Sequence, residues 1–278
     1  MNVQDRPPEQ AVARLPIVAT VVSAFTVTYR DPVLLLRAAA GGLMLIAAAS
    51  AIFLVVPNAA TMMLVLFIAP LAAYSHFGVN WYRIVLLGPP GLVRPSLRWD
   101  RRHWRVFGYA LAINLATLLV QVPLTLALPP LATVIALGVF YVTARLSFIF
   151  PALAVEENYS LALSWRHTQG QGGWRLTVAL LAAAIPLYLL LSIVLGQIFV
   201  ILIGVPVAAI AAAGPGNPEI IAQIAEQISP VAVIAVVMIS FALLMAVLAV
   251  LFAIVAIAFR TCTGWVPAGP QNLPDVFE

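Results

Sequence analysis

Four long stretches of this sequence carry no formal charge, and no other feature restricts the fold as strongly. They cover residues 38–82, 106–144, 176–218 and 227–259. A helix needs about 20 mainly apolar residues to cross the hydrocarbon core of a bilayer, so each stretch can hold at least one crossing. The composition agrees, because 63% of the 278 residues are hydrophobic and only 9% are charged. We therefore expect an all-α integral membrane protein.

Proline and glycine divide the charge-free stretches into separate helices. The first stretch breaks at Pro57, with Asn58 as the expected cap of the next helix, and the second breaks at Pro129. The third is interrupted at Pro186 and Gly204, which indicates one kinked helix followed by a shorter apolar segment. The chain is predicted to be one polytopic membrane domain, residues 1–278, with six transmembrane helices at about residues 33–56, 59–83, 106–123, 131–151, 175–205 and 230–259.

Two segments outside the spans have the pattern of amphipathic helices, and residues 1–13 and 261–278 are expected to be tails, the first of them disordered. Residues 15–30 carry large apolar side chains at three- and four-residue steps: Val18, Val21, Val22, Phe25 and Tyr29. The apolar run there is only about 21 Å long as a helix, so we expect it at the interface or against the core. The loop before the last span places four isoleucines on one helical face, which indicates a helix on the outer surface: Ile220, Ile221, Ile224 and Ile228.

All 14 basic residues are arginines, and their placement orients the spans. They lie before the first span, between the second and third, between the fourth and fifth, and after the sixth. The opposite connections contain only Glu219 and Glu226 as charged residues. Because cytoplasmic loops are enriched in Arg and Lys, we expect both termini in the cytoplasm. A seventh span near the N-terminus would place Arg6 and Arg14 on the wrong side.

Aromatic residues stand near the ends of the predicted spans: Tyr74, Trp81, Tyr82, Trp104 and Trp174. Because Trp and Tyr are enriched at membrane interfaces, we expect these side chains at the headgroups. The two long cytoplasmic connections also share a layout. Arg83 and Arg145 are each followed by apolar residues, a connector and a Trp-Arg pair. This indicates either an internal repeat of helical hairpins or the flanking pattern that any such hairpins would show.

Two segments carry a resemblance to a known group of proteins: "VVSAFTVTYRDPVLLLRAA" and "ARLSFIFPALAVEENYSLALSWRHTQGQGGWRL". The matching positions are Ala24, Phe25, Arg145, Pro151, Ser160, Ala162, Trp165, Thr168, Gly170, Trp174 and Arg175. They resemble six-helix bacterial inner-membrane proteins of the YciC-like family and the membrane domain attached to some glycerophosphodiester phosphodiesterases. The resemblance implies a bacterial inner-membrane location with cytoplasmic termini. It implies no activity, and because this chain is expected to lack the phosphodiesterase domain, that chemistry is not carried over.

The sequence contains no H-E-x-x-H, G-x-S-x-G or G-K-[ST] motif, so we expect no enzyme, no cofactor and no metal site. Glu156, Glu157 and His167 are the one group that offers three metal-ligand types, but their spacing fits no common metal motif. The neighbouring glycine run at residues 170–173 lacks the strand and Lys-Ser/Thr of a phosphate loop. It is expected to end a short interfacial helix capped by Asn158 or Ser160.

The segment "RPSLRWDRRHWR" is the strongest candidate for function, since its arginines recur at three- and four-residue steps. We expect this face to contact anionic lipid headgroups or another membrane protein, and not nucleic acid. Its arginines also suffice as a topology determinant, and the two interpretations are compatible. The candidate contact residues are Arg94, Arg98, Arg101, Arg102, Arg105, Arg166, Trp104, Trp174 and Arg175.

Polar groups within the spans are few, which bears on transport. No Asp, Glu or Arg lies deep in a span, and this argues against an ion-coupled transporter. Asn114, Thr117 and Gln121 share a helical face and are expected to hydrogen-bond between helices. The first hypothesis is therefore a non-enzymatic inner-membrane protein that organises anionic lipid or a membrane complex through its Arg-rich elbows. The alternative is a permease or channel for a neutral or lipidic substrate, with the interrupted fifth helix as its moving part.

Overall fold

A computed structural model of the chain describes residues 15–56, 58–88, 98–155, 158–203 and 230–267, and the regular elements in these ranges are all helical. The elements before the first arginine-rich connection are α1 (Ile17–Tyr29), α2 (Pro32–Val55), α3 (Ala59–Met63), the π-helical turn η2 (Leu64–Ile68) and α4 (Ala69–Leu87). Those after it are α5 (Arg101–Ala127), the 3-10 turn η3 (Pro129–Leu131), α6 (Ala132–Leu146), α7 (Ile149–Ala154), α8 (Leu161–His167), α9 (Gln171–Ile203) and α12 (Pro230–Thr263).

Six helical segments are long and apolar enough to cross a membrane: Pro32–Val55, Ala60–Leu87, Arg101–Ala127, Pro129–Ala154, Gly172–Ile198 and Ile234–Thr263. The prediction of a polytopic helical protein with six candidate spans is thereby confirmed. The expected outer-surface helix around Ile220 and the terminal tail at 1–13 lie outside the described residues, as do Arg94, Glu156 and Glu157.

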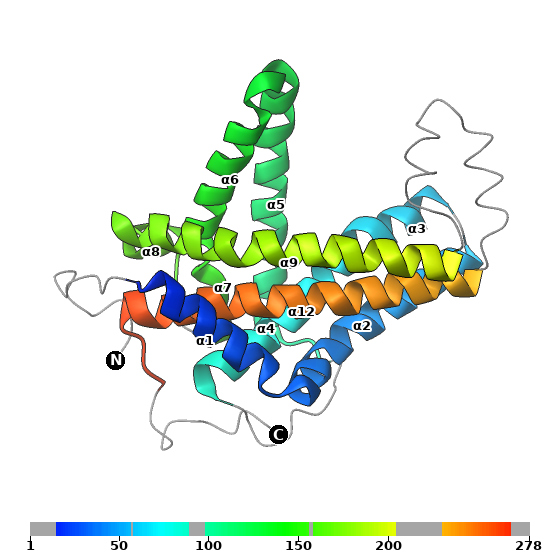
Figure 1. The fold of residues 1–278 in the computed structure, drawn as a ribbon, viewed down its shortest axis with the longest axis horizontal. Coiled ribbons are helices and arrows are strands. Elements are labelled where there is room, and N and C mark those ends of the chain that lie inside the picture. Colours follow the sequence, from blue (N-terminus) through cyan, green and yellow to red (C-terminus); the bar gives the residue numbers. More distant parts are fainter. Residues whose placement is uncertain (1–14, 57, 89–97, 156–157, 204–229, 268–278) are drawn as a thin grey trace.

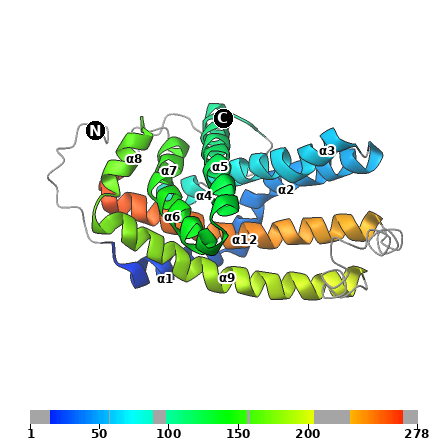
Figure 2. The same ribbon diagram turned by 90° about the horizontal axis from the view of Figure 1, so that it is seen from above.

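The spans fall into two parts (Figure 1). Helices α2, α4, α9 and α12 run together and are called the body, and α9 and α12 lie side by side along its length. Helices α5 and α6 form a hairpin, called the arm, that rises away from the body; Figure 2 views the arm nearly along its length. Within the described ranges, the arm contacts the rest of the protein near its base, where α5 packs on α4 and α7, and α6 packs on α9 and α8.

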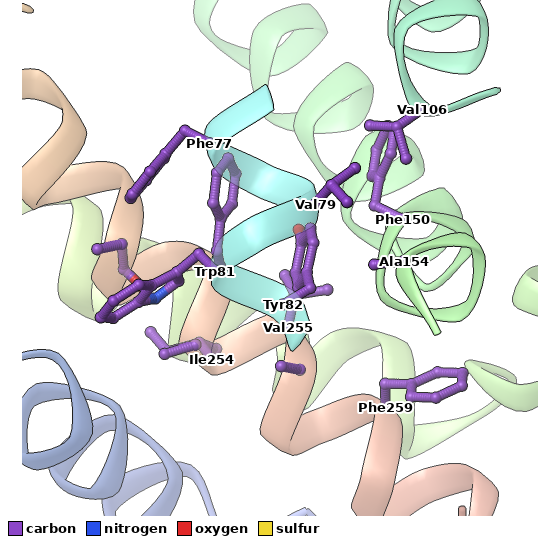
Figure 3. Close-up of a cluster of buried hydrophobic side chains, with 14 of the residues drawn as sticks. Phe77, Val79, Trp81, Tyr82, Val106, Phe150, Ala154, Ile254, Val255 and Phe259 are labelled. Carbon is purple, nitrogen blue, oxygen red and sulfur yellow. The ribbon is translucent and has the colours of Figure 1, made fainter. Parts of the chain in front are cut away.

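The centre of the body is an aromatic cluster between α4 and α12 (Figure 3). Phe252 of α12 packs edge-on against Tyr74 and lies 5.1 Å from the ring of Tyr82. The indole Nε1 of Trp81 donates a hydrogen bond of 2.8 Å to the carbonyl of Ala249 in α12. Trp81 and Tyr82 are only 1% and 2% exposed, so the expectation that they lie at the headgroups is wrong. Their face of α4 is turned to α12, and the rings join helices instead.

Close helix contacts in the body depend on small residues. A Cβ on Gly41 of α2 would collide with the ring of His76 in α4, and a Cβ on Gly42 would come within 3.0 Å of the carbonyl of Ala73. Lipid-embedded helices gain little from hydrophobic exclusion, so close van der Waals packing has to hold them together. The glycines therefore bring the backbones of α2 and α4 within reach of one another.

Helix α1 packs against α12 and α9 through a face that differs from the predicted one. Its buried residues are Thr20, Ala24 and Thr28, spaced four apart, whereas Val18 and Val22 are 76% and 58% exposed. The expected stripe of large apolar residues is thus mostly turned outward. Small side chains allow α1 to approach its neighbours closely, and the larger ones are left for the surroundings. A helix at 15–30, expected at the interface or against the core, is thus found packed on α12 and α9, mainly through its small residues.

Local sequence signals account for several helix boundaries. The side chain of Asp31 accepts a hydrogen bond from the Leu34 N–H at the start of α2. Asn58 forms a capping box with Thr61, as the sequence indicated, and so opens α3 after the break at residue 57. Pro186 lies inside α9, which is one continuous helix from Gln171 to Ile203. This helix contains Pro186 as predicted, whereas Gly204 and the shorter apolar segment expected after it lie outside the described residues, so the permease hypothesis stays a prediction.

Candidate functional site

Residues 98–105, called the first elbow, form the start of α5, and a carboxylate fixes them. Asp100 caps the helix: its side chain accepts hydrogen bonds from the N–H groups of Arg102 and His103, at 3.0 and 3.2 Å. The Nδ1 atom of His103 lies 2.7 Å from the same carboxylate oxygen. Partial burial raises the pKa of Asp100, but His103 and Arg102 lower it by more, so the net shift is downward. The carboxylate therefore stays ionised and is occupied by the helix end.

The arginines of the first elbow differ in how far they are exposed. Arg98 and Arg101 are exposed, and Arg102 and Arg105 are half-buried. Arg101 and Arg105 have no hydrogen-bond or ion-pair partner among the residues that the structure describes. Trp104, between them, is 63% exposed. The predicted contact residues of this elbow thus present positive charge and one large indole outward.

Aromatic rings attach the first elbow to the body. Trp99 packs on His103 and on Trp104, with ring centroids 5.4 and 5.5 Å apart. The ring of His103 stacks on that of His76 in α4 at 5.0 Å. His76 is 2% exposed, and its Nδ1 lies 3.4 Å from the side-chain nitrogen of Asn80. The start of α5 is therefore held at a fixed position against α4.

Residues 158–175, called the second elbow, are organised by the buried side chain of Arg145 from the last turn of α6. Its Nη2 donates to the carbonyl of Trp165 at 2.7 Å, and its Nε donates to the Thr168 hydroxyl at 3.2 Å. Its guanidinium carbon also lies 3.5 Å from the centroid of the Trp165 ring. In return, the Ser164 hydroxyl donates to the Arg145 carbonyl at 2.6 Å. We call this set of contacts the Arg145 clasp.

The clasp adds hydrogen-bond donors and a positive charge at the end of α8. The last carbonyls of a helix have no intrahelical donor, and a cation near them is favourable. Arg145 supplies both to α8. Arg83 of α4 does the same for α7, since its Nη1 donates to the carbonyl of Ala154 at 3.2 Å. The two arginines that open the predicted repeat thus have similar contacts, while the repeat itself stays a prediction.

Glycine and serine define the limits of α8. Ser160 caps the helix by accepting a hydrogen bond from the Leu163 N–H, as the sequence indicated. Gly170 ends the segment with a φ of 63°, a left-handed conformation that favours glycine. A Cβ on Gly173 would lie 2.5 Å from the carbonyl of Thr168 and 3.1 Å from the Arg145 side chain. The glycine run therefore permits close contact within the elbow, as expected for a turn without phosphate chemistry.

The remaining predicted contact residues of the second elbow differ in role. Arg166 is exposed, and Trp174 is 62% exposed at the start of α9. Arg175 is half-buried, and its Nη1 donates to the carbonyl of Leu15 at 3.3 Å, next to α1. Arg166 and Trp174 are thus available to an outside partner, whereas Arg175 joins two parts of the chain.

His167, once considered with two glutamates as a metal site, has a different neighbour in the structure. Its Nδ1 lies 2.8 Å from the hydroxyl of Tyr159. Burial and, to a smaller extent, the charge of Arg166 lower the pKa of His167. The neutral ring and the Tyr159 hydroxyl can each donate or accept this hydrogen bond, depending on which ring nitrogen carries the proton. Within the described ranges, no three His, Cys, Asp or Glu side chains come together in a way that would hold a metal ion.

Two features were missed by the sequence analysis. The first is the buried position of Arg145 and its contacts with α8, because this residue was only matched to a motif. The signal that could have revealed it is its position at the end of an apolar run, just before a turn. The second is an apolar groove along the arm.

Asn114, expected to bond between helices, instead donates to the carbonyl of Ala110 in its own helix at 2.8 Å and is exposed.

No protein-family model matches the chain, and no match is found among curated proteins or among solved structures. Function therefore has to be argued from the elbows and the arm.

Proposed function

We propose that the protein is a non-enzymatic membrane protein of the bacterial inner membrane that organises anionic lipid, or a membrane complex, through its Arg-rich elbows on the cytoplasmic side. The observation that supports this most is the pair Arg101 and Arg105. These cations stand at the start of a candidate span and have no partner among the described residues, and the exposed Trp104 lies between them. Phosphate groups of anionic lipids are the charges expected at that depth.

The charge balance of the first elbow supports the same proposal. Asp100 is the carboxylate nearest to these arginines, and it is already bound to the N–H groups at the start of α5. It therefore does not neutralise Arg101 or Arg105 by direct contact. An uncompensated basic surface attracts an anionic membrane by about 1 kcal/mol for each arginine near it. Two arginines are thus expected to change lipid preference by more than tenfold.

The exposed indoles favour a membrane surface over a soluble partner. Trp104 and Trp174 stand in the first turns of α5 and α9, where two spans begin. Such amphipathic rings are enriched at the headgroup level of bilayers. The predicted resemblance to YciC-like proteins and the cytoplasmic placement of the termini belong to this proposal and rest on the sequence motifs and the arginine distribution.

In the experiment, the full chain is purified from vesicles that contain equal amounts of phosphatidylglycerol and phosphatidylcholine. The lipids that stay bound to the protein are then measured by mass spectrometry. The double variant R101Q/R105Q is compared with the control R30Q/R37Q, which removes two other exposed arginines. We expect the native chain and the control to retain the anionic lipid preferentially, with the preference largely lost in R101Q/R105Q. An unchanged lipid ratio in R101Q/R105Q would rule out the elbow as the lipid contact.

A further inference from the structure

An apolar groove of about 620 Å³ runs along the arm between α5 and α6. Its walls include Tyr109, Ala116, Val120, Gly138, Val142 and Leu161. Small residues form its floor: a Cβ on Gly138 would meet no atom within 4 Å, and Ala116 is exposed. The groove therefore lies where three small residues, Ala112, Ala116 and Gly138, stand among the larger apolar side chains that line it.

Helix geometry gives the groove its length. Its lining residues on α5 extend from Tyr109 to Leu124. At a rise of about 1.5 Å per residue, this distance is roughly 22 Å. The hydrocarbon core of a bilayer is about 30 Å thick, and one lipid chain covers half of that. A single acyl chain therefore fits lengthwise within the groove.

The end of the groove nearest the first elbow is polar. Arg105 lies four residues before Tyr109, so the two share a face of α5 one turn apart. Neither side chain has a hydrogen-bond partner in the part of the chain that the structure describes. Side chains on a helix also lean toward its N-terminus, which brings the guanidinium toward the elbow and not into the groove. A cation and a hydroxyl thus stand at the mouth of an apolar channel.

Leu161, the first residue of α8, joins the groove wall at the same end. The Arg145 clasp fixes α8 against α6 through Trp165 and Thr168. The second elbow therefore closes one side of the mouth, while the first elbow supplies the charge. This connects the groove to both elbows.

We propose that the groove binds one acyl chain of an anionic phospholipid, whose phosphate contacts Arg105 while its glycerol region faces the hydroxyl of Tyr109. The inference rests on the proposed function and names its ligand site. An apolar segment of a second copy of this chain would also fill the groove. However, the carboxylates of the described residues, Asp31 and Asp100, are both engaged as helix caps, so such a copy offers Arg105 no counter-charge from this region.

The test uses the full chain in vesicles that contain a trace of phosphatidylglycerol with a photoreactive diazirine in one acyl chain. A parallel sample carries the same chain on phosphatidylcholine. After illumination, labelled peptides are mapped by mass spectrometry. We expect labelling of α5 and α6 residues in the groove, stronger for phosphatidylglycerol by about fivefold or more, as the attraction of one arginine to a headgroup of net negative charge implies.

Two glycines supply a matched pair of variants. Gly138 lies in the groove, Gly196 lies in α9, and an added Cβ meets open space at both positions, so Gly138→Leu and Gly196→Leu add the same side chain at two positions that accept a Cβ. Gly138→Leu is expected to reduce groove labelling at least fivefold, and Gly196→Leu to leave it unchanged. Arg105→Gln is expected to equalise labelling by the two lipids.

The outcomes separate this inference from the proposed function. The groove site is overturned if phosphatidylglycerol is retained preferentially but the groove is not labelled. It is also overturned if Gly138→Leu does not reduce the labelling. In both cases the function proposed for the elbow stands. Groove labelling that is equal for both lipids in the native chain overturns the anionic assignment. Loss of all headgroup preference, in retention and in labelling alike, overturns both. Crosslinking between two copies that Gly138→Leu abolishes would assign the groove to a dimer instead.

Discussion

All six candidate spans are apolar, yet the helices of the body and of the arm differ sharply in what their side chains touch. In the most apolar window of α12, 56% of the residues are buried, whereas in that of α5 only 6% are. The body is held by aromatic rings, glycine contacts and the hydrogen bond from Trp81. Within the described ranges, the arm contacts the rest of the chain near its base. Hydropathy alone does not distinguish a helix that serves packing from one that presents its surface to the bilayer.

This difference indicates a division of roles. A helix with little protein contact must find its partners in lipid or in another molecule, because its apolar surface is not covered otherwise. The arm also starts at the first elbow, where the unpartnered arginines lie. We therefore associate stability with the body and lipid contact with the arm, and the following predictions test that association, from the largest effect to the smallest.

The joint between the two parts is expected to be the most sensitive position. Arg145→Gln removes a buried guanidinium and its two hydrogen bonds to Trp165 and Thr168. Hydrogen bonds that involve a charged group contribute about 1.5–3 kcal/mol each, so the loss in unfolding free energy is expected to be about 3–6 kcal/mol. It can be measured by SDS titration in mixed micelles, with the exposed Arg260→Gln as control. A loss as small as that of the control would show that the clasp does not hold the arm to the elbow.

Glycine-to-alanine changes should separate the body from the arm directly. Gly41→Ala forces a methyl group into the ring of His76, and such overpacking costs about 1–3 kcal/mol. Gly138→Ala meets open space and gains helix propensity, so it should stabilise the arm by up to about 1 kcal/mol. The same titration measures both variants. Equal destabilisation by the two changes would contradict the picture of an uncovered arm.

Tryptophan substitutions provide a finer comparison. Trp81→Phe keeps a buried ring but loses the hydrogen bond to Ala249, which leaves that carbonyl to its own helix; we expect a loss of about 0.5–1.5 kcal/mol. Trp104→Phe, at an exposed position, should leave the unfolding free energy nearly unchanged and weaken retention of anionic lipid instead. Stability and lipid retention, measured on the same two proteins, check this. A stability loss in Trp104→Phe that matches Trp81→Phe would remove the distinction.

The smallest expected effect is the pH dependence of the second elbow. Burial and Arg166 lower the pKa of His167 in the folded protein, so folding favours the neutral ring. The stabilisation is complete above the unfolded pKa of about 6.5 and is lost as the pH falls below it, toward the folded pKa. We expect the thermal midpoint of the native chain to fall between pH 7 and pH 5 by more than that of His167→Gln. Parallel pH curves for the two proteins would refute a role for His167.

The sequence predicted the elements of the fold well because charge-free length, proline and caps act locally. Asn58, Ser160 and the glycine at 170 mark helix ends through bonds to their own neighbours. Which face of each helix contacts protein was harder to predict. Trp81 stands near the end of a span and Val18 in a helix expected at an interface, and both side chains are largely apolar. Trp81 is buried, whereas Val18 is exposed. Which side meets protein depends on the positions of the other helices, and no local pattern records that.

The candidate site shows the same limit. The arginines and indoles of the elbows were found from spacing, because their three- and four-residue steps are visible in the sequence itself. Arg145 was not recognised as a buried residue, because its partners, Trp165 and Thr168, belong to a later segment that turns back on α6. The groove was missed for a similar reason. Ala116 and Gly138 become its floor only when α5 and α6 lie side by side.

The position of α1 has a consequence for the biosynthesis of the protein. This helix leaves the ribosome first, but its buried face contacts α12 and α9, and the carbonyl of Leu15 is bound by Arg175. At about 5–20 residues per second, α12 is completed roughly ten to fifty seconds after α1. During that time α1 has to wait at the membrane surface, a state that its exposed Val18 and Val22 suit. Insertion of the last span then closes the chain on its own beginning, so truncation before α12 should leave α1 accessible to protease.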